Sequence, residues 1–263
     1  MPVSIACVDA FTDRPFAGNP AAICLLDGPR DAAWMQQVAA EMNLAETAFV
    51  TPAGDGFGLR WFTPLVEVDL CGHATLGTAH FLWTTGVVQG SGPIAFNTRS
   101  GVLRAARRDD AVELDFPSEA ATEEDTPAAL AAALGVPLLW TGSNRMDYLV
   151  EVESEQVLRA LAPDLAAIAR MDRRGVIVTC AGRGTPYDFL SRFFAPGAGI
   201  PEDPVTGSAH CALAPFWAAR LGRRELVGFQ ASPRGGIVRV TLAGDRVLLG
   251  GQAVTVYTGT LHA

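Results

Sequence analysis

The stretch RWFTPLVEVDLCGHATLGTAHFLWTTG, from Arg60 to Gly86, decides the fold because the chain contains it twice. The second copy, RFFAPGAGIPEDPVTGSAHCALAPFWAARLG, runs from Arg192 to Gly222. Each copy opens with Arg, an aromatic residue, Phe, a small residue and Pro, and then crosses a loop that carries carboxylates. A Gly and an apolar run of helical character follow. Because the first amides of a helix point outward and favour anions, we expect two helix starts that face one ligand.

The repeat extends beyond this stretch. VTPAG at 50–54 matches VTCAG at 178–182, a separation of 128 residues, and the separation is 132 between Arg60 and Arg192. It reaches 135 at Gly72 and Gly207 and stays there through RSGVLRAARRDDAVEL (99–114) over RGGIVRVTLAGDRVLL (234–249). Two small loop insertions explain the increases in this separation. The sequence therefore predicts duplication of a whole domain and not a solenoid of short repeats.

Each half is predicted to hold several strands, a surface helix and an enclosed helix. Strands are expected at 3–10, 21–26, 47–51 and 175–182, and surface helices at 31–42, with Asp31 as its cap, and at 164–171. The runs 73–85 and 208–221 are apolar nearly all round, so each must be enclosed. The expected fold class is α/β (α+β), with two pseudo-symmetric domains, each a barrel-like sheet wrapped around a central helix.

The two domains are expected at 1–117 and 118–263, with the alternative that the last strand returns to the first domain. The acidic segment PSEAATEEDTP at 117–127 is bounded by prolines, and we interpret it as an exposed linker.

Composition excludes several classes of protein. The chain has 263 residues, of which 49% are hydrophobic and 18% charged, so disorder is not expected. A net charge of −8 without a basic run argues against nucleic acid or an anionic membrane as partner. Every Lys-or-Arg position is Arg, which excludes a lysine-bound pyridoxal phosphate and a P-loop lysine.

The five cysteines and the first residues bear on location. An odd number of cysteines with no CxxC spacing indicates a reduced, cytoplasmic protein. MPVSIACVDAFTDRPF lacks the basic and apolar regions of a signal peptide, and no apolar segment is long enough to cross a bilayer.

Glu46, in NLAETAFV, is the first candidate for chemistry. The repeat breaks its symmetry here, because the matching place near Val176 carries an apolar or small residue. A carboxyl group in an apolar surrounding can carry a proton in both directions. The alternative is a strand-edge Glu that faces solvent.

Polar residues at the two enclosed helices are the next candidates. His73 follows Gly72, and a histidine can hold or donate a proton near neutrality. Asp203 and Ser208 flank the second helix start and can orient such a group or bind substrate. The alternatives are a neutral core histidine, and helix caps at Asp203, Thr206 and Ser208.

Cys71 precedes the first enclosed helix, where the helix start can lower the pKa of a thiol. A two-thiol racemase needs a second thiol, but Val205 and Thr206 stand at the matching place. We therefore interpret Cys71 as a small buried hydrophobic residue. His73, His80, His210 and Cys211 lack metal-ligand spacing, so no metal is expected.

The motifs DAFTDRPFAGNPAAIC, NLAETAFV, CGHATLGTAH, DFP and EDPVTGSAH resemble the phenazine-biosynthesis PhzF-like family almost from end to end. This family shares its fold with diaminopimelate epimerase and proline racemase: two similar α/β domains, each a barrel-like sheet around a central helix, with the active site in the cleft between them. The resemblance also implies a homodimer.

The resemblance implies a cofactor-independent isomerase, like the founding enzyme, which shifts a proton in dihydro-3-hydroxyanthranilate. Its catalytic residues fall on Glu46, His73 and Asp203. Substrate contacts are implied at Asn19, Gly72, Ala74, Thr206, Gly207 and Ser208. The expected substrate is a small carboxylate metabolite, with neither nucleic acid nor membrane as partner.

Two other functions stay open at this point. The chain could be a non-catalytic small-molecule binding protein that keeps the fold, or a cysteine-assisted racemase or epimerase that uses Cys71.

Overall fold

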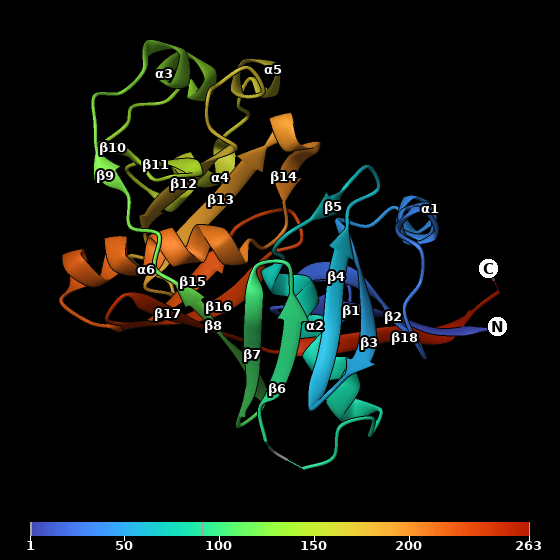
Figure 1. Ribbon diagram of the computed structural model, residues 1–263. Coiled ribbons are helices and arrows are strands. Elements are labelled where there is room, and N and C mark those ends of the chain that lie inside the picture. Colours follow the sequence, from blue (N-terminus) through green and yellow to red (C-terminus); the bar gives the residue numbers. More distant parts are fainter. Residues whose placement is uncertain (1, 91, 263) are drawn as a thin grey trace. The chain divides into compact units, whose positions relative to one another are not determined.

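The computed structural model describes residues 2–90 and 92–262 (Figure 1). Met1 and Ala263, the outermost residues of the two predicted domains, lie outside this part, as does Ser91. The chain divides into two compact units. Unit 1 is Met1–Asp115 with Gly250–Ala263, and unit 2 is Phe116–Leu249.

Unit 1 is built on one curved set of strands. Its strands are β1 (Val3–Ala10), β2 (Asn19–Leu25), β3 (Glu46–Ala53), β4 (Gly56–Phe62), β5 (Glu67–Val68), β6 (Ile94–Thr98), β7 (Gly101–Arg108), the first part of β8 (Ala111–Pro117), and β18 (Ala253–Leu261). Pairing runs β18–β1–β2–β3–β4–β6–β7–β8, and β5 also pairs with β4. The β2–β3 and β4–β6 pairs are parallel and the others antiparallel.

Unit 2 repeats this order. Its strands are β9 (Thr122–Glu123), β10 (Trp140–Ser143), β11 (Asp147–Glu151), β12 (Gly175–Ala181), β13 (Phe189–Ala195), β14 (Ile200–Asp203), β15 (Glu225–Gln230), β16 (Gly236–Ala243) and β17 (Arg246–Gly251). Pairing runs β9–β10–β11–β12–β13–β15–β16, and β14 also pairs with β13. The parallel pairs β11–β12 and β13–β15 occupy the same places in the strand order as β2–β3 and β4–β6 in unit 1. The predicted duplication is confirmed.

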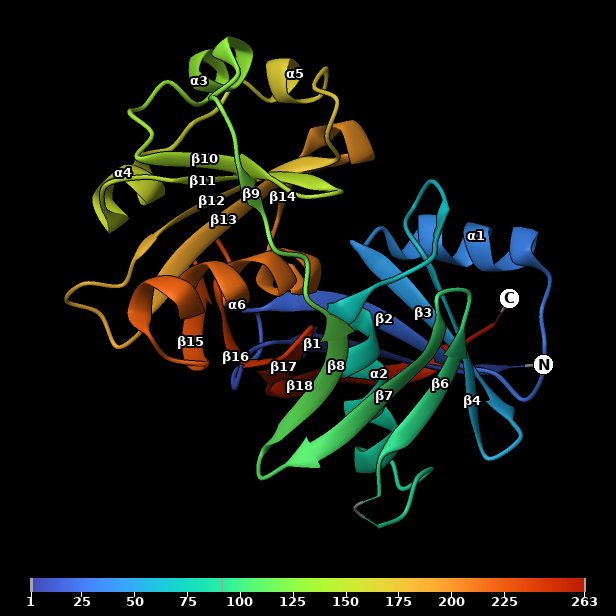
Figure 2. The same ribbon diagram turned by 60° about the vertical axis from the view of Figure 1, so that its left-hand side comes forward.

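One helix in each unit is enclosed, as its apolar sequence predicts. In α2 (Gly72–Thr84), residues 73–79 and 81–83 are buried, and the helix packs against β1, β2, β3, β7 and β18. Figure 2 shows α2 inside the curved strands of its own unit. In unit 2, α6 (Gly207–Leu221) packs against β15 and β16.

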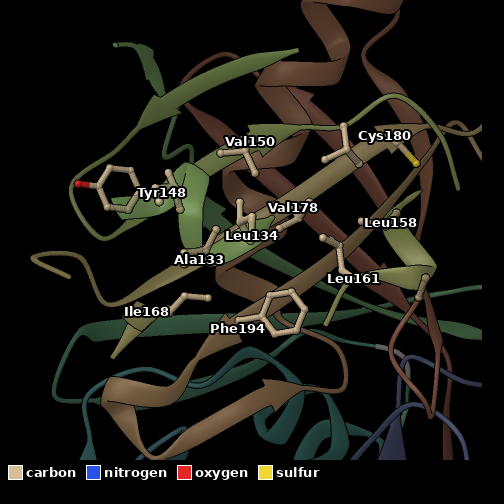
Figure 3. Close-up of a cluster of buried hydrophobic side chains, with 14 of the residues drawn as sticks. Ala133, Leu134, Tyr148, Val150, Leu158, Leu161, Ile168, Val178, Cys180 and Phe194 are labelled. Carbon is tan, nitrogen blue, oxygen red and sulfur yellow. The ribbon is translucent and has the colours of Figure 1, made fainter. Parts of the chain in front are cut away.

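The remaining helices lie on the outer faces. In unit 1, α1 (Ala32–Met42) packs on β3 and β4 over a core that includes Phe49 and Phe62. Asp31 occupies its N-cap position but makes no side-chain capping hydrogen bond, contrary to the prediction. In unit 2, three short helices cover the core shown in Figure 3: α3 (Ala128–Leu134), α4 (Glu155–Ala160) and α5 (Leu165–Ile168). Unit 2 also contains the short 3-10 helix η1 (Pro196–Ala198).

The segment predicted to be an exposed linker is partly ordered. The backbone N–H of Ser118 donates to Asp245 O at 2.8 Å, and that of Glu119 donates to Cys211 O at 3.1 Å. Thr122 and Glu123 form β9, which pairs with β10. Side chains also hold the segment, since Ser143 Oγ donates to Glu124 at 3.0 Å and Arg145 donates to Glu119 at 2.9 Å. Its acidic composition did not reveal these partners.

The Arg that opens each copy of the repeat has a structural partner. Arg60 donates to both carboxylate oxygens of Glu67 at 2.7 and 2.8 Å, and its guanidinium lies over the Phe62 ring. Arg192 binds Glu202 in the same way, at 2.7 and 2.9 Å, over the Phe194 ring. These two loop carboxylates therefore serve the fold.

Two further features concern the chain as a whole. Among the described residues, no helix is long and apolar enough to span a membrane. No disulfide joins any of the five cysteines, and all five are buried.

Candidate functional site

The topology of unit 1 brings three of the predicted residues to one edge of its sheet. Asn19 is the first residue of β2, and Glu46 is the first residue of β3. Because these strands are parallel neighbours, with Ala21 opposite Glu46, both side chains lie at the same edge. Helix α2 begins at this edge and contributes His73, its second residue.

The imidazole of His73 lies at the centre of this group. Its Nε2 stands 3.3 Å from Oε2 of Glu46, and its Nδ1 stands 3.2 Å from Nδ2 of Asn19. Cys71, at the N-cap position of α2, places its Sγ 3.5 Å from the same Nδ1. All four side chains belong to residues that are at most 9% exposed. The strand-edge alternative, in which Glu46 faces solvent, is wrong.

Burial keeps the imidazole of His73 uncharged. Desolvation lowers the pKa of His73 to about 3, so the ring is neutral at pH 7. A neutral imidazole keeps one N–H donor and one nitrogen acceptor. Glu46 therefore stands beside a ring that can donate or accept a hydrogen bond without adding a charge.

The start of α2 also carries Gly72 and Ala74, two predicted substrate contacts. Gly72 is the first residue of the helix, and Ala74 is fully buried two residues later. Cys71 makes no side-chain capping hydrogen bond, and Thr75 Oγ1 donates instead to the Cys71 carbonyl at 2.5 Å. The backbone amides of this first turn are those that the sequence predicts to bind an anion.

A second polar group surrounds the start of α6 in unit 2. Thr206 Oγ1 donates to Oδ2 of Asp203 at 2.5 Å, and Gln230 Nε2 donates to the Asp203 carbonyl at 2.7 Å and to Thr206 Oγ1 at 3.1 Å. The Thr206 N–H in turn donates to Oε1 of Gln230 at 2.9 Å. All three residues are buried. Thr206 occupies the N-cap position, but its hydroxyl does not cap the helix.

Ser208, next to Gly207 in the first turn of α6, has a cationic partner. Nη2 of Arg174 donates to Ser208 Oγ at 2.9 Å. The same guanidinium forms a two-point contact with the buried carboxylate of Asp147, at 2.9 and 2.5 Å. Arginine has no acceptor, so the Ser208 oxygen must accept here, and its own hydroxyl proton remains available to donate elsewhere.

Arg174, Asp147 and Gln230 were missed by the sequence reasoning. A signal existed for Arg174, because the separation of 128 residues at VTPAG and VTCAG places it opposite Glu46. In the strand ladders Phe49 faces Arg60 and Val178 faces Arg192. With Arg60 and Arg192 as equivalent positions, Phe49 matches Val178, and Glu46 matches Gly175. The strand register therefore differs by one residue from the sequence match, and the counterpart of Glu46 is a small residue next to Val176, directly after Arg174. Nothing in the sequence points to Gln230.

Glu46, Cys71 and His73 also offer atoms of the kinds that bind Zn²⁺. These atoms lie within 4.8 Å of one another. The Asn19 amide nitrogen, however, occupies the Nδ1 side of the ring. The sequence assigns no metal to this group, and the function proposed below uses none.

Comparison with known proteins identifies the family. A family model described as phenazine biosynthesis-like protein matches residues 8–259. The chain belongs to this family. It is 52% identical over 262 residues to an uncharacterized isomerase of Halalkalibacterium halodurans, with 99% of each chain covered. A solved phenazine biosynthesis protein of the PhzF family from Enterococcus faecalis is 38% identical, covers 100% of both chains and has a TM-score of 0.95.

A more distant likeness concerns the fold alone. The structure of a probable proline racemase from Agrobacterium radiobacter has a TM-score of 0.67 at 14% identity, and the match covers 98% of this chain and 92% of that one. The predicted fold, shared by PhzF-like and racemase-like proteins, is confirmed.

Proposed function

We propose that this phenazine biosynthesis-like protein is a cofactor-independent isomerase. It shifts a proton, or inverts a centre, next to a carboxylate in a small amino- or hydroxy-acid-like metabolite. The observation that carries this proposal is the buried contact between Glu46 and a neutral His73. The isomerase name of the Halalkalibacterium halodurans relative supports the reaction class.

Glu46 acts as both base and acid in this proposal. Its carboxylate takes a proton from a carbon atom of the substrate, so that a C–H bond breaks and an O–H bond forms. The electron pair left behind moves into the adjacent unsaturated system of the substrate. The same O–H then returns its proton to another carbon, or to the opposite face of the first one, and no external oxidant or reductant is needed.

The residues at the start of α6 are proposed to bind the carboxylate of the substrate. Ser208 accepts from Arg174, so its hydroxyl donates to the bound anion. The backbone amides near Gly207 add donors of the same kind. Asp203, held by Thr206 and Gln230, is proposed to assist proton transfer, as the family resemblance implies.

Exchange of substrate protons with solvent tests whether the protein turns over at all. Pools of small amino- and hydroxy-acid-like carboxylates are incubated with the wild-type protein in D₂O, and deuterium at carbon is measured by mass spectrometry. An isomerase of this kind incorporates deuterium into at least one member of the pools. Binding of a metabolite without any incorporation would support the binding-protein alternative.

A cysteine-assisted reaction is favoured by one observation, the 3.5 Å approach of Cys71 Sγ to His73 Nδ1. The proposal expects Cys71→Ala to keep most of the exchange activity, because Glu46 and not the thiol carries the proton. Loss of exchange in Cys71→Ala, together with inactivation of the wild type by a thiol-alkylating reagent, would favour the cysteine-assisted racemase or epimerase.

A further inference from the structure

The two ring nitrogens of His73 face different partners. On the Nδ1 side stand the amide nitrogen of Asn19, at 3.2 Å, and Sγ of Cys71, at 3.5 Å. An amide NH₂ group donates hydrogen bonds and does not accept them. The Nδ1 atom must therefore accept from Asn19, and it cannot carry the proton of a neutral ring.

The single N–H of the ring is then on Nε2, which stands 3.3 Å from Oε2 of Glu46. This separation is longer than a well-formed hydrogen bond, and contacts of this kind commonly shorten when a substrate binds. The ring stays neutral because burial lowers the pKa of His73 to about 3. An Nε2–H tautomer gives the carboxylate a donor, whereas the other tautomer would set a lone pair against it.

The backbone holds Asn19 firmly in its place. The preceding residue, Gly18, has a φ of +65°, and a Cβ there would stand 2.1 Å from the Ala10 carbonyl oxygen. Only glycine fits this turn, which leads directly into β2. Asn19 itself is fully buried, so its side chain has little freedom to turn away from His73.

We propose that Asn19 is a positioning residue that fixes His73 as the Nε2–H tautomer, so that the imidazole donates to Oε2 of Glu46. The role of Glu46 rests on the proposed function. The tautomer rests only on the contacts of Asn19 and His73.

His210, on α6 in unit 2, provides a contrast within the same chain. Its Nδ1 lies 2.8 Å from the Thr206 carbonyl oxygen, which can only accept a hydrogen bond. The proton of His210 is therefore on Nδ1. Burial lowers its pKa to about 4, so this ring too is neutral at pH 7. The two buried histidines are expected to carry opposite tautomers.

Nitrogen NMR of the full chain labelled with ¹⁵N-histidine at pH 7 tests the assignment. Protonated and unprotonated ring nitrogens have well-separated chemical shifts, and the four histidines are assigned by single His→Gln substitutions. The proposal expects the Nε2–H pattern for His73 and the Nδ1–H pattern for His210. An Nδ1–H pattern for His73 would overturn it.

Two substitutions of Asn19 test the cause. Asn19→Asp keeps the shape but replaces the donor with an acceptor, so His73 is expected to change to the Nδ1–H tautomer and turnover to fall by at least ~10²-fold. Asn97→Asp, on the exposed face of β6, is the matched control and is expected to change neither.

Asn19→Leu covers the case in which a buried aspartate prevents folding. It removes the donor without adding a charge, and the His73 signals are expected to show a mixture of tautomers. If either folded variant leaves His73 purely Nε2–H, the positioning role is wrong. Full turnover in a Glu46→Gln variant with the expected tautomers would instead overturn the proposed function and leave the tautomer assignment standing.

Discussion

The two units place different chemistry on the same scaffold. In unit 1, the first residue of β3, Glu46, contacts His73 in the first turn of α2 at 3.3 Å. In unit 2, Arg174 directly precedes β12 and contacts Ser208 in the first turn of α6 at 2.9 Å. His73 and Ser208 occupy matching positions, since both follow the Gly residues that are 135 residues apart.

This difference separates two tasks. The pair in unit 1 contains a carboxyl group and a neutral ring, which suits the movement of a proton. The pair in unit 2 contains a cation that Asp147 holds in place and a hydroxyl that accepts from it, so the hydroxyl proton can be donated to an anion. Duplication kept the backbone positions and changed the side chains, and this asymmetry is the reason why the proposed proton transfer is assigned to unit 1.

The Arg–Glu pairs that the two units share are expected to contribute unequally to stability. Arg192 also donates to the carbonyl oxygens of Leu158 and Leu161, and its side chain is 11% exposed. Arg192→Met should therefore lower the free energy of unfolding by about 3–5 kcal/mol, because a carboxylate and two carbonyl groups lose their donor. Arg60→Met should cost only about 1 kcal/mol, since Arg60 is 32% exposed and Arg99 remains 2.7 Å from Glu67.

Denaturant unfolding of both variants measures these losses. Arg104→Met, at an exposed position of β7, is the control and should change the stability little. Equal losses for Arg60→Met and Arg192→Met would contradict the explanation by burial and additional carbonyl partners.

Ser208→Ala sharpens the assignment of anion binding to unit 2. Loss of one hydrogen bond to a charged group is expected to weaken substrate binding by about 1.5–3 kcal/mol, roughly 10- to 150-fold in KM. The value of kcat should change much less, because the proton transfer is assigned to unit 1. Steady-state kinetics on a substrate found by deuterium exchange separates the two constants, and an effect confined to kcat would speak against a binding role.

The pH dependence of stability should depend on the buried histidines. Because burial lowers the pKa of His210 from 6.5 to about 4, the unfolded chain binds a proton in this range that the folded chain does not. The free energy of unfolding is therefore expected to fall by about 1.4 kcal/mol for each pH unit below 6.5 on account of this residue.

His210→Asn tests this contribution, since its amide can still donate to the Thr206 carbonyl but does not titrate. Denaturant unfolding at pH 7 and at pH 5 should show a shallower loss of stability in the variant than in the wild type. Parallel losses would show that His210 is protonated equally in both states.

Much of the fold could be predicted from the sequence. Whole-domain duplication and the two enclosed helices follow from the matching separations and from helices that are apolar all round. Glu46 and His73 could also be selected as candidate site residues from the sequence. A break in the repeat marks Glu46, and a polar residue at the start of an apolar helix marks His73. The catalytic and binding roles assigned to the predicted residues remain predictions.

The rest depends on contacts between distant segments. Gln230 reaches Asp203 and Thr206 only because β15 pairs beside β13, and no spacing in the sequence records that pairing. Arg174 was hidden for a different reason, since arginine before a strand is normally a solvated residue. The sequence assigned no partner to the carboxylates of the repeated loops, whereas Glu67 and Glu202 neutralise the arginines of the neighbouring strands β4 and β13.

Replacement of Glu46 by Gln tests most directly whether its carboxyl group carries the proton. Deuterium incorporation at carbon is measured for the wild type, Glu46→Gln and the exposed control Glu41→Gln, with folding checked by circular dichroism. Wild-type exchange is expected in Glu41→Gln, and a loss of ~10²–10⁴-fold is expected in a folded Glu46→Gln protein. Exchange at the wild-type rate in Glu46→Gln would show that the Glu46 carboxyl group does not carry the proton.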